Sequence, residues 1–229
     1  PAAAARLVTG LEILARARNL LAIEGEPEGE PLRAALLVDL LRRRGDGPYL
    51  PAISADGRDG TDTGPPTGEA VYHEGDRLAL RVTHQAGRPL YLHVFDVGLA
   101  GAVHQLYPIR GASDPLLPGQ LFEIGTTPGQ TLTVRIPAEL DAQARAAGRE
   151  HRESREVLKI FVTTDEADLS GWEQESRRGS PAGSLASLLR LALGGPATRD
   201  TPPAPTPGSL WTVVTRTFLV RRAPEPDRR

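Results

Sequence analysis

Short apolar runs separated by turn residues fill the last two thirds of the sequence. In one of them Leu78, Leu80 and Val82 alternate with polar residues, so one side of a strand meets a core and the other meets water. A nearly continuous apolar run at Val157–Thr163 and an alternating run at Trp211–Val220 extend the series. Short strands spaced by turns are typical of all-β sandwiches. We therefore predict a mainly β fold, an antiparallel β-sandwich of the immunoglobulin-like kind.

The N-terminal part of the chain predicts a helix instead. Between Ala4 and Ile23 the apolar residues recur at steps of three and four, the period of an amphipathic helix. Its predicted apolar stripe consists of Leu7, Val8, Leu11, Leu14, Ala15 and Leu21. The stretch Leu32–Arg44 fits either a strand or a short helix, and its alternation favours the strand. One or two short surface helices are also expected, at Ala138–Glu150 and Ser184–Leu193.

The chain has 229 residues, enough for one large domain with appendages. Residues 1–44 are predicted to hold the N-terminal helix and a linking segment, and residues 45–68 a loop rich in Gly, Asp and Pro. The sandwich then spans residues 69–222. Inside it, residues 195–209 are predicted to form an irregular loop, because their prolines remove backbone donors. Residues 223–229 form a charged tail.

Composition narrows the classes of function. The net charge is −2, so no basic excess favours nucleic acid or an acidic membrane as a partner. The short basic clusters at 42–44 and 221–222 lack interleaved aromatic residues, which favours solvated faces. No apolar run reaches the ~18 residues of a membrane span, and no signal peptide fits. The chain starts at Pro1 and holds no Met, so we expect a soluble fragment of a longer protein.

Candidate catalytic and metal-binding residues are few. Cys is absent, which removes a cysteine nucleophile, and no Gly-x-Ser-x-Gly elbow occurs. The five histidines lack the spacing that places two metal ligands on one helix face. Asp56, Asp59 and Asp62 are candidate calcium ligands in a Gly-rich loop, although their spacing is not that of an EF-hand and Asp is also an ordinary turn residue. We predict no catalytic residue and no cofactor, and expect this chain not to be an enzyme.

Aromatic residues gather in one predicted hairpin. Tyr91, His93 and Phe95 share a face of its first strand, and Tyr107 ends its second strand. These four are candidate partner-binding residues, because aromatic side chains are enriched in protein interfaces. The alternative is that they cover the second side of the sandwich.

The same hairpin contains two of the histidines. With pairing centred on residues 98–100, His93 lies opposite Gln105 and His104 lies opposite Val94. The two rings then point to opposite faces of the sheet. A zinc site between them is therefore disfavoured.

Several segments together resemble a bacterial domain of unknown function. They are Gly-Asp-Arg-Leu-Ala-Leu-Arg-Val at 75–82, Tyr-Leu-His-Val-Phe-Asp at 91–96, Gly101 followed by Gln-Leu-Tyr-Pro at 105–108, Leu-Pro-Gly at 117–119 and Leu-Lys-Ile-Phe-Val-Thr-Thr-Asp at 158–165. In that family the domain is typically appended C-terminally to caspase-like (metacaspase-type) peptidases and their relatives. Residues 14–21 are similar to the segment that links such peptidases to it.

The resemblance implies a non-catalytic accessory or protein-binding domain of a bacterial caspase-like peptidase, acting in regulation or target recruitment. Its partner would be another protein or the upstream peptidase domain itself. No functional residue is carried over, since the family has no catalytic constellation in this domain and the caspase His and Cys would lie upstream of Pro1. The alternative is an independent envelope or carbohydrate-binding β-sandwich, assisted by calcium at the aspartate loop.

Overall fold

The computed structural model describes residues 12, 14–25, 30–52, 69–98, 101–109, 113–136, 144–150, 152–167, 169 and 210–222. The chain divides into two compact units. Unit 1 comprises residues 1–36, 84–120 and 157–216, and unit 2 comprises residues 37–83, 121–156 and 217–229. Each unit is described below by itself.

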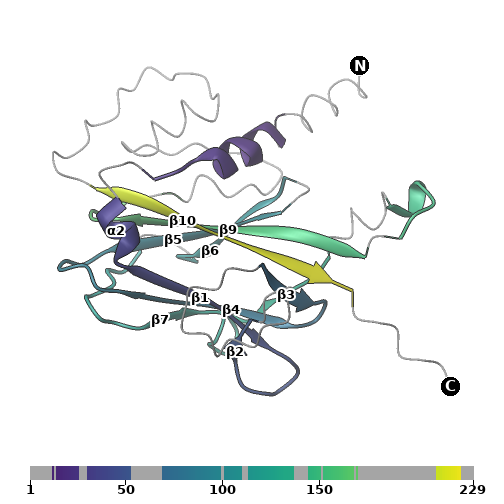
Figure 1. Ribbon diagram of the computed structural model, residues 1–229, viewed down its shortest axis with the longest axis horizontal. Helices are drawn as coiled ribbons and strands as arrows, with labels where there is room; N and C mark the ends of the chain where they lie inside the picture. The colour runs from purple at the N-terminus through teal and green to yellow at the C-terminus, as the bar shows by residue number, and fades with distance from the viewer. Residues whose placement is uncertain are drawn as a thin grey trace. The chain divides into compact units, whose positions relative to one another are not determined.

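Strands dominate the described part of the chain (Figure 1). The elements are α2 (Glu30–Ala34), β1 (Leu36–Arg43), β2 (Leu50–Pro51), β3 (Ala70–His73), β4 (Arg77–His84), β5 (Tyr91–Gly98), β6 (Val103–Tyr107), β7 (Phe122–Ile124), β8 (Leu132–Thr133), β9 (Glu153–Thr163) and β10 (Trp211–Arg221). Sheet A has the order β2-β1-β4-β7, with β8 also paired to β4, and sheet B has the order β3-β10-β9-β5-β6. The prediction of a mainly β fold with two sheets is confirmed. The immunoglobulin-like topology stays a prediction.

The pairing of β3 with β10 departs from the predicted antiparallel arrangement. The pairs β1–β2, β4–β7, β4–β8 and β5–β6 are antiparallel. Strand β3, however, runs parallel to β10, with Ala70 opposite Phe218 and His73 opposite Arg221. These two strands are far apart in the sequence, so no local turn fixes their relative direction.

The ambiguous stretch between Leu32 and Arg44 contains both of the elements that it could form. The short helix α2 ends at Ala34, and β1 begins two residues later at Leu36. Because β1 pairs with β2 and β4, it belongs to sheet A rather than to a linking segment. The sheets therefore begin earlier in the chain than the predicted boundary at residue 69.

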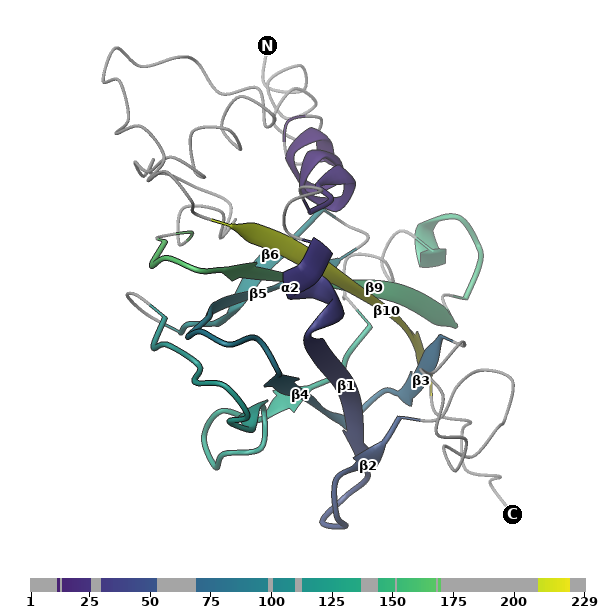
Figure 2. The ribbon, with the colours of Figure 1, turned by 60° about the vertical axis from the view of Figure 1, so that its left-hand side comes forward.

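In unit 1, the N-terminal helix covers one face of sheet B (Figure 2). Within residues 14–22 of this helix, Ala17 and Leu20 are buried. They belong to one apolar cluster with Phe95, Val97, Val103, Phe161, Leu169 and Val213. The predicted stripe was wrong where it can be compared, since Leu14 is 49% exposed and Leu21 is 37% exposed. Both sides of the helix carry apolar residues, and spacing alone does not decide which side meets the sheet.

The end of the N-terminal helix is held by the only lysine in the sequence. Lys159 Nζ, on β9, donates a hydrogen bond to the Ile23 carbonyl at 2.9 Å. The last carbonyls of a helix have no intrahelical donor, and an ammonium there also complements the helix dipole. Burial lowers the pKa of Lys159, while the Glu24 carboxylate acts to raise it. Just beyond, Gly25 lies so close to β10 that an added Cβ would be 2.6 Å from Thr212 Oγ1.

In unit 2, Tyr72 ties β3 to β1. Its hydroxyl donates to the Leu41 carbonyl at 3.1 Å, and its ring meets Phe218 edge-on with centroids 5.1 Å apart. The side chain is fully buried, and that burial raises the pKa of the phenol. The hydrogen bond between Tyr72 of sheet B and Leu41 of sheet A thus connects the two sheets inside this unit.

Several sequence predictions lie outside the described residues. They concern residues 53–68 of the Gly-rich loop, the helix at Ser184–Leu193, the loop at 195–209 and the tail at 223–229. Of the helix predicted at Ala138–Glu150, residues 144–146 are helical. No helix in the described ranges is long and apolar enough to cross a membrane.

Candidate functional site

Two of the four candidate partner-binding residues lie in the core. His93 and Phe95 are both 0% exposed, and Phe95 meets Phe161 edge-on with ring centroids 5.9 Å apart. The interpretation of these two as part of a recognition surface is therefore wrong, because β5 is buried on both faces from Leu92 to Phe95. Tyr91 and Tyr107 remain partly exposed.

The β5–β6 hairpin has a different register from the predicted one. His104 pairs with Asp96, and Gln105 pairs with Phe95. The reason is that Gly98 N donates to the Ala102 carbonyl at 3.0 Å, which places the turn one residue later than expected. His93 is buried whereas His104 is exposed, so the two histidines do not form a site.

Strand β6 forms the outer edge of sheet B in unit 1. Hydrogen-bonded and non-bonded pairs alternate along an antiparallel ladder, starting here from the bonded pair of Gly98 and Ala102. The backbone groups of Val103 and Gln105 therefore point away from β5. No residue in the described ranges bonds to these outward groups. Val103 is 1% exposed, so its outward groups are covered, whereas Gln105 is partly exposed and its outward backbone can accept a further strand.

Asp96, opposite His104 on this hairpin, is an unusual carboxyl group. Its Oδ1 is buried and has no hydrogen-bond partner among the described residues. Burial raises its pKa from 3.8 to about 6, and the nearby His104 acts in the opposite direction. Because Asp96 alternates with Phe95 and Val97, it points away from the face that the N-terminal helix covers.

We expect Asp96→Asn to stabilise the protein at pH 7.5. The folded carboxyl holds a proton up to about pH 6, whereas the unfolded one releases it near 3.8. Stability of the wild type should thus fall as the pH rises through this window. Because Asp96 is partly exposed, we expect the free energy of unfolding to fall by roughly 2 kcal/mol. Asparagine carries no charge at either pH, so the variant should not lose this stability. Urea unfolding at pH 4.5 and 7.5 measures the difference between the two proteins.

The exposed carboxyl of Asp114 in the same unit supplies the control. Asp114→Asn should leave the difference between the two pH values as it is in the wild type. Equal pH dependence of the wild type and Asp96→Asn would contradict the role given to Asp96.

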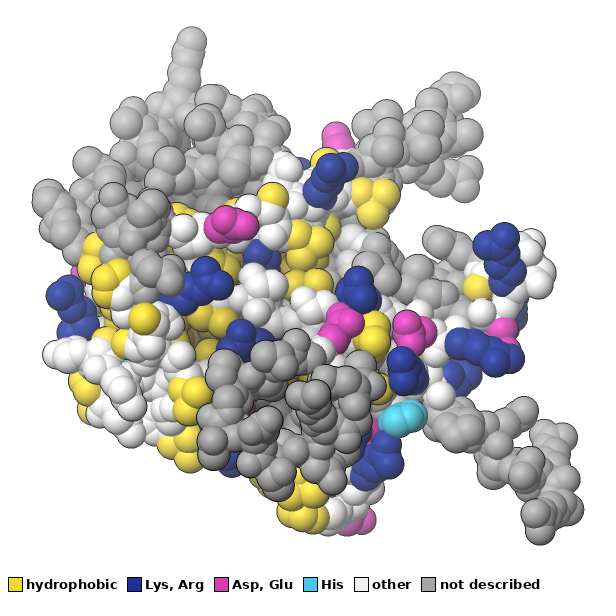
Figure 3. Space-filling view, viewed as in Figure 1, with side chains coloured by type: hydrophobic (Ala, Val, Ile, Leu, Met, Phe, Trp, Pro, Cys, Tyr) yellow, Lys and Arg dark blue, Asp and Glu magenta, His cyan; other side chains and the backbone are white. Residues whose placement is uncertain are grey.

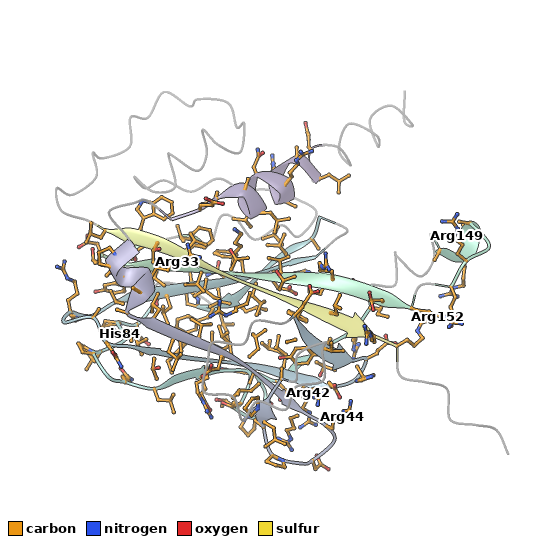
Figure 4. The ribbon with its side chains drawn as sticks, in the orientation of Figure 1. Arg33, Arg42, Arg44, His84, Arg149 and Arg152 are labelled. Atoms are coloured by element: carbon orange, nitrogen blue, oxygen red, sulfur yellow. The ribbon has the colours of Figure 1, made fainter. Side chains whose placement is uncertain are left out.

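A second group of polar side chains lies in unit 2, where β1 ends and β3 turns into β4. We call Arg42, Arg44, His73 and Asp76 the arginine–histidine cluster; Figure 4 labels Arg42 and Arg44 at the end of β1. Asp76 is buried, and its carboxylate lies 3.5 Å from Arg44 Nε and 4.0 Å from Arg42 Nε. Two guanidinium groups thus share one carboxylate.

The Gly-Asp pair of this turn has a structural role. Asp76 N donates to the His73 carbonyl at 2.9 Å, and His73 N donates to Asp76 Oδ2 at 2.8 Å. Gly75 has a φ of 91°, which the third position of a type II turn requires and glycine adopts freely. The run that resembles the family therefore begins with residues that build a turn.

Two members of the cluster, Arg42 and Asp76, bond to the outward backbone of β3. Arg42 Nη1 donates to the Val71 carbonyl at 3.0 Å, and Asp76 accepts from His73 N. Val71 and His73 are the residues whose backbone groups point away from β10, since Glu74 N bonds to the Arg221 carbonyl. Side chains thus bond to two outward groups of this edge, which hinders the pairing of another strand here.

The other half of the cluster is exposed. Arg44 Nη2 lies 2.7 Å from His73 Nδ1, and the side chains are 60% and 32% exposed. A guanidinium only donates, so Nδ1 must be the accepting nitrogen and Nε2 carries the proton. Burial and then the Arg44 charge lower the pKa of His73, against the effect of Asp76. On the face that Figure 3 shows, a histidine side chain lies beside basic side chains.

The predicted calcium ligands Asp56, Asp59 and Asp62 lie outside the described residues. Within the described ranges, no group of three or more His, Cys, Asp or Glu side chains could hold a metal ion. His84 is buried, and its Nε2 donates to the Leu116 carbonyl at 2.9 Å. This contact holds the loop after β5 and β6 to the end of β4.

Comparison with protein-family models, with curated proteins and with solved structures finds no match to this chain. The resemblance to the accessory domain of caspase-like peptidases therefore rests on the sequence segments alone. In the structure these segments form the β3–β4 turn with β4, most of β5, the end of β6 and the second half of β9.

Sequence reasoning missed the arginine–histidine cluster. Arg44 and His73 are 29 residues apart and meet only through the fold. Two signals were present, the run of three arginines at 42–44 and the Gly75–Asp76 pair. The first was interpreted as a solvated face and the second as a family motif, because neither pattern shows which residues it meets.

Proposed function

We propose that this chain is a non-catalytic accessory domain that binds a protein partner, as part of a bacterial caspase-like peptidase. The observation that supports binding most directly is the outward backbone of β6 at the partly exposed Gln105. An extended peptide can add to such an edge by main-chain hydrogen bonds, while alternate side chains select the sequence.

The surroundings of this edge suit a peptide partner. Tyr107 ends β6 and is partly exposed, and Ile109 follows it with 60% exposure. Exposed aromatic and aliphatic side chains at the end of an edge strand are common anchors in protein interfaces. The contrast with β3 strengthens the proposal, since side chains bond to the outward backbone of β3, whereas no described residue bonds to the outward backbone of Gln105.

A proline at the edge tests this proposal. Gln105→Pro removes the outward N–H of β6 and spares the ladder to β5, because residue 105 is in a non-bonded pair. We expect an array of extended peptides to bind the wild type and to lose most of that binding with the variant. Binding should proceed without peptide hydrolysis.

The matched control is Gln105→Ala. It also removes the side-chain hydrogen bond from Gln105 Nε2 to the Pro108 carbonyl, yet it keeps the backbone N–H. The alanine variant should bind like the wild type. Hydrolysis of the peptides, equal binding by the proline variant, or calorimetric heat only with calcium and glycans would overturn the proposal. A caspase-like parent further requires a peptidase His and Cys in the chain that precedes Pro1.

A further inference from the structure

We propose that the β6 edge selects peptides with a basic side chain, Lys or Arg, opposite His104, because the carboxylate of Asp96 attracts it. The inference rests on the function proposed above and names the class of peptide that this edge would bind. Asp96 and His104 are cross-strand partners on β5 and β6. Their side chains therefore lie on one face of the hairpin, with His104 exposed on the outer strand.

The ladder brings the peptide residue opposite His104 close to this pair. Bonded and non-bonded pairs alternate, so the backbone of His104 bonds to β5 and that of Gln105 points outward. Against an added antiparallel strand, His104 thus forms a non-bonded pair, with Cα atoms about 4.5 Å apart. About 5.5 Å more leads across the bonded pair to Asp96. A lysine or arginine side chain extends over much of this distance.

The charge of Asp96 is poorly screened. Its Oδ1 is buried and accepts no hydrogen bond from the described residues. A carboxylate oxygen with neither a hydrogen bond nor water beside it acts over a longer distance than an exposed one, because the local dielectric is low. A basic side chain of the peptide need not touch this buried atom, since the attraction acts between charges. Asp114, by contrast, is exposed and screened by solvent.

The sign of the selectivity follows from the charge on this face of the hairpin. Burial raises the pKa of Asp96 to about 6, so its carboxyl group is ionised at pH 8.5. The group that acts on this carboxyl from the neighbouring strand is His104. Because histidine side chains titrate between about pH 5 and 8, a measurement at pH 8.5 removes their charge from the comparison. A basic peptide side chain is then attracted and an acidic one is repelled.

A lysine scan of one bound peptide tests the inference. The probe is the peptide of the array that binds the wild type most tightly, with Lys, Gln or Glu placed at each position in turn. Binding is measured at pH 8.5 and about 0.01 M salt. Because side chains alternate between the two faces of a strand, Lys should bind more tightly than Gln at only one alternating set of positions. We expect an advantage of roughly fivefold in Kd next to His104, and weaker binding with Glu there.

Asp96→Asn should remove the advantage of Lys over Gln, because asparagine has nearly the same shape and no charge. This variant is expected to be more stable than the wild type above pH 6, so unfolding does not explain the loss. The matched control is Asp114→Asn, which removes an exposed carboxylate of the same unit and should keep the full advantage.

Two results overturn the inference while the β6 edge stands as a peptide site. In the first, peptides bind but Lys and Gln are equivalent at every position. In the second, the advantage of Lys persists in Asp96→Asn. If no peptide of the array binds the wild type, the edge itself fails and this inference falls with it.

Discussion

Phe161→Ala should cost about 3–5 kcal/mol of unfolding free energy, the range for removing a large aromatic side chain from a core. Phe161 is 0% exposed on β9 and meets Phe95 on β5 edge-on. It also belongs to the cluster through which Ala17 and Leu20 of the N-terminal helix contact sheet B. The substitution therefore opens a cavity at the junction of helix and sheet. Urea unfolding followed by circular dichroism measures the loss.

Because the cavity lies under the N-terminal helix, the helix should also lose local stability. Amide hydrogen exchange within residues 14–22 should accelerate more than exchange in β4, because the helix loses part of the surface on which it packs. Leu117→Ala serves as the control, since Leu117 lies in the same unit and is 54% exposed. Its effect should stay within about 0.5 kcal/mol. A loss as small as this for Phe161→Ala would contradict the packing described.

Gly125→Ala should destabilise the protein by about 3 kcal/mol, through two separate effects. Gly125 has a φ of 89°, and an L-residue in a left-handed conformation costs about 1–2 kcal/mol. In addition, an added Cβ would lie 2.6 Å from the Leu78 carbonyl oxygen of β4. A backbone atom inside a sheet cannot move aside, and overpacking of this kind costs about 1–3 kcal/mol. Thermal or urea unfolding measures the sum.

Gly129→Ala separates the two effects. Gly129 has a similar φ of 84°, but nothing lies within 4 Å of an added Cβ. It should therefore lose only the conformational part, about 1–2 kcal/mol. Equal losses in the two variants would show that β4 yields at this point, contrary to the close approach seen beside Leu78.

The strands with the strongest patterns were predictable from the sequence. The alternation from Trp211 onward gives β10, and the buried run at Val157–Thr163 gives the second half of β9. Pairing between distant strands was not predictable, and β3 beside β10 shows why. Two strands that are not joined by a tight turn can pair in either direction, and no local sequence pattern records which direction they take.

The candidate sites, too, were predictable from the sequence only in part. The aromatic residues of the β5–β6 hairpin were visible in the sequence, but a one-residue difference in the turn changed which residues face each other. Period-two alternation also gave no sign that β5 is buried on both faces, which places His93 and Phe95 in the core. The surface around Arg44 and His73 came from no pattern at all, because its parts lie on separate strands.

By itself, the sequence determined the fold class, since alternating apolar side chains can be buried only as strands with one face on a core. It also determined that no cysteine chemistry operates within this chain. The tertiary structure alone decided which edges of sheet B are closed. At β3 the side chains of Arg42 and Asp76 satisfy the outward backbone, whereas at β6 no described side chain does. The reason is physical, since a free edge is a property of neighbouring strands and of the side chains that reach them, and not of any one segment.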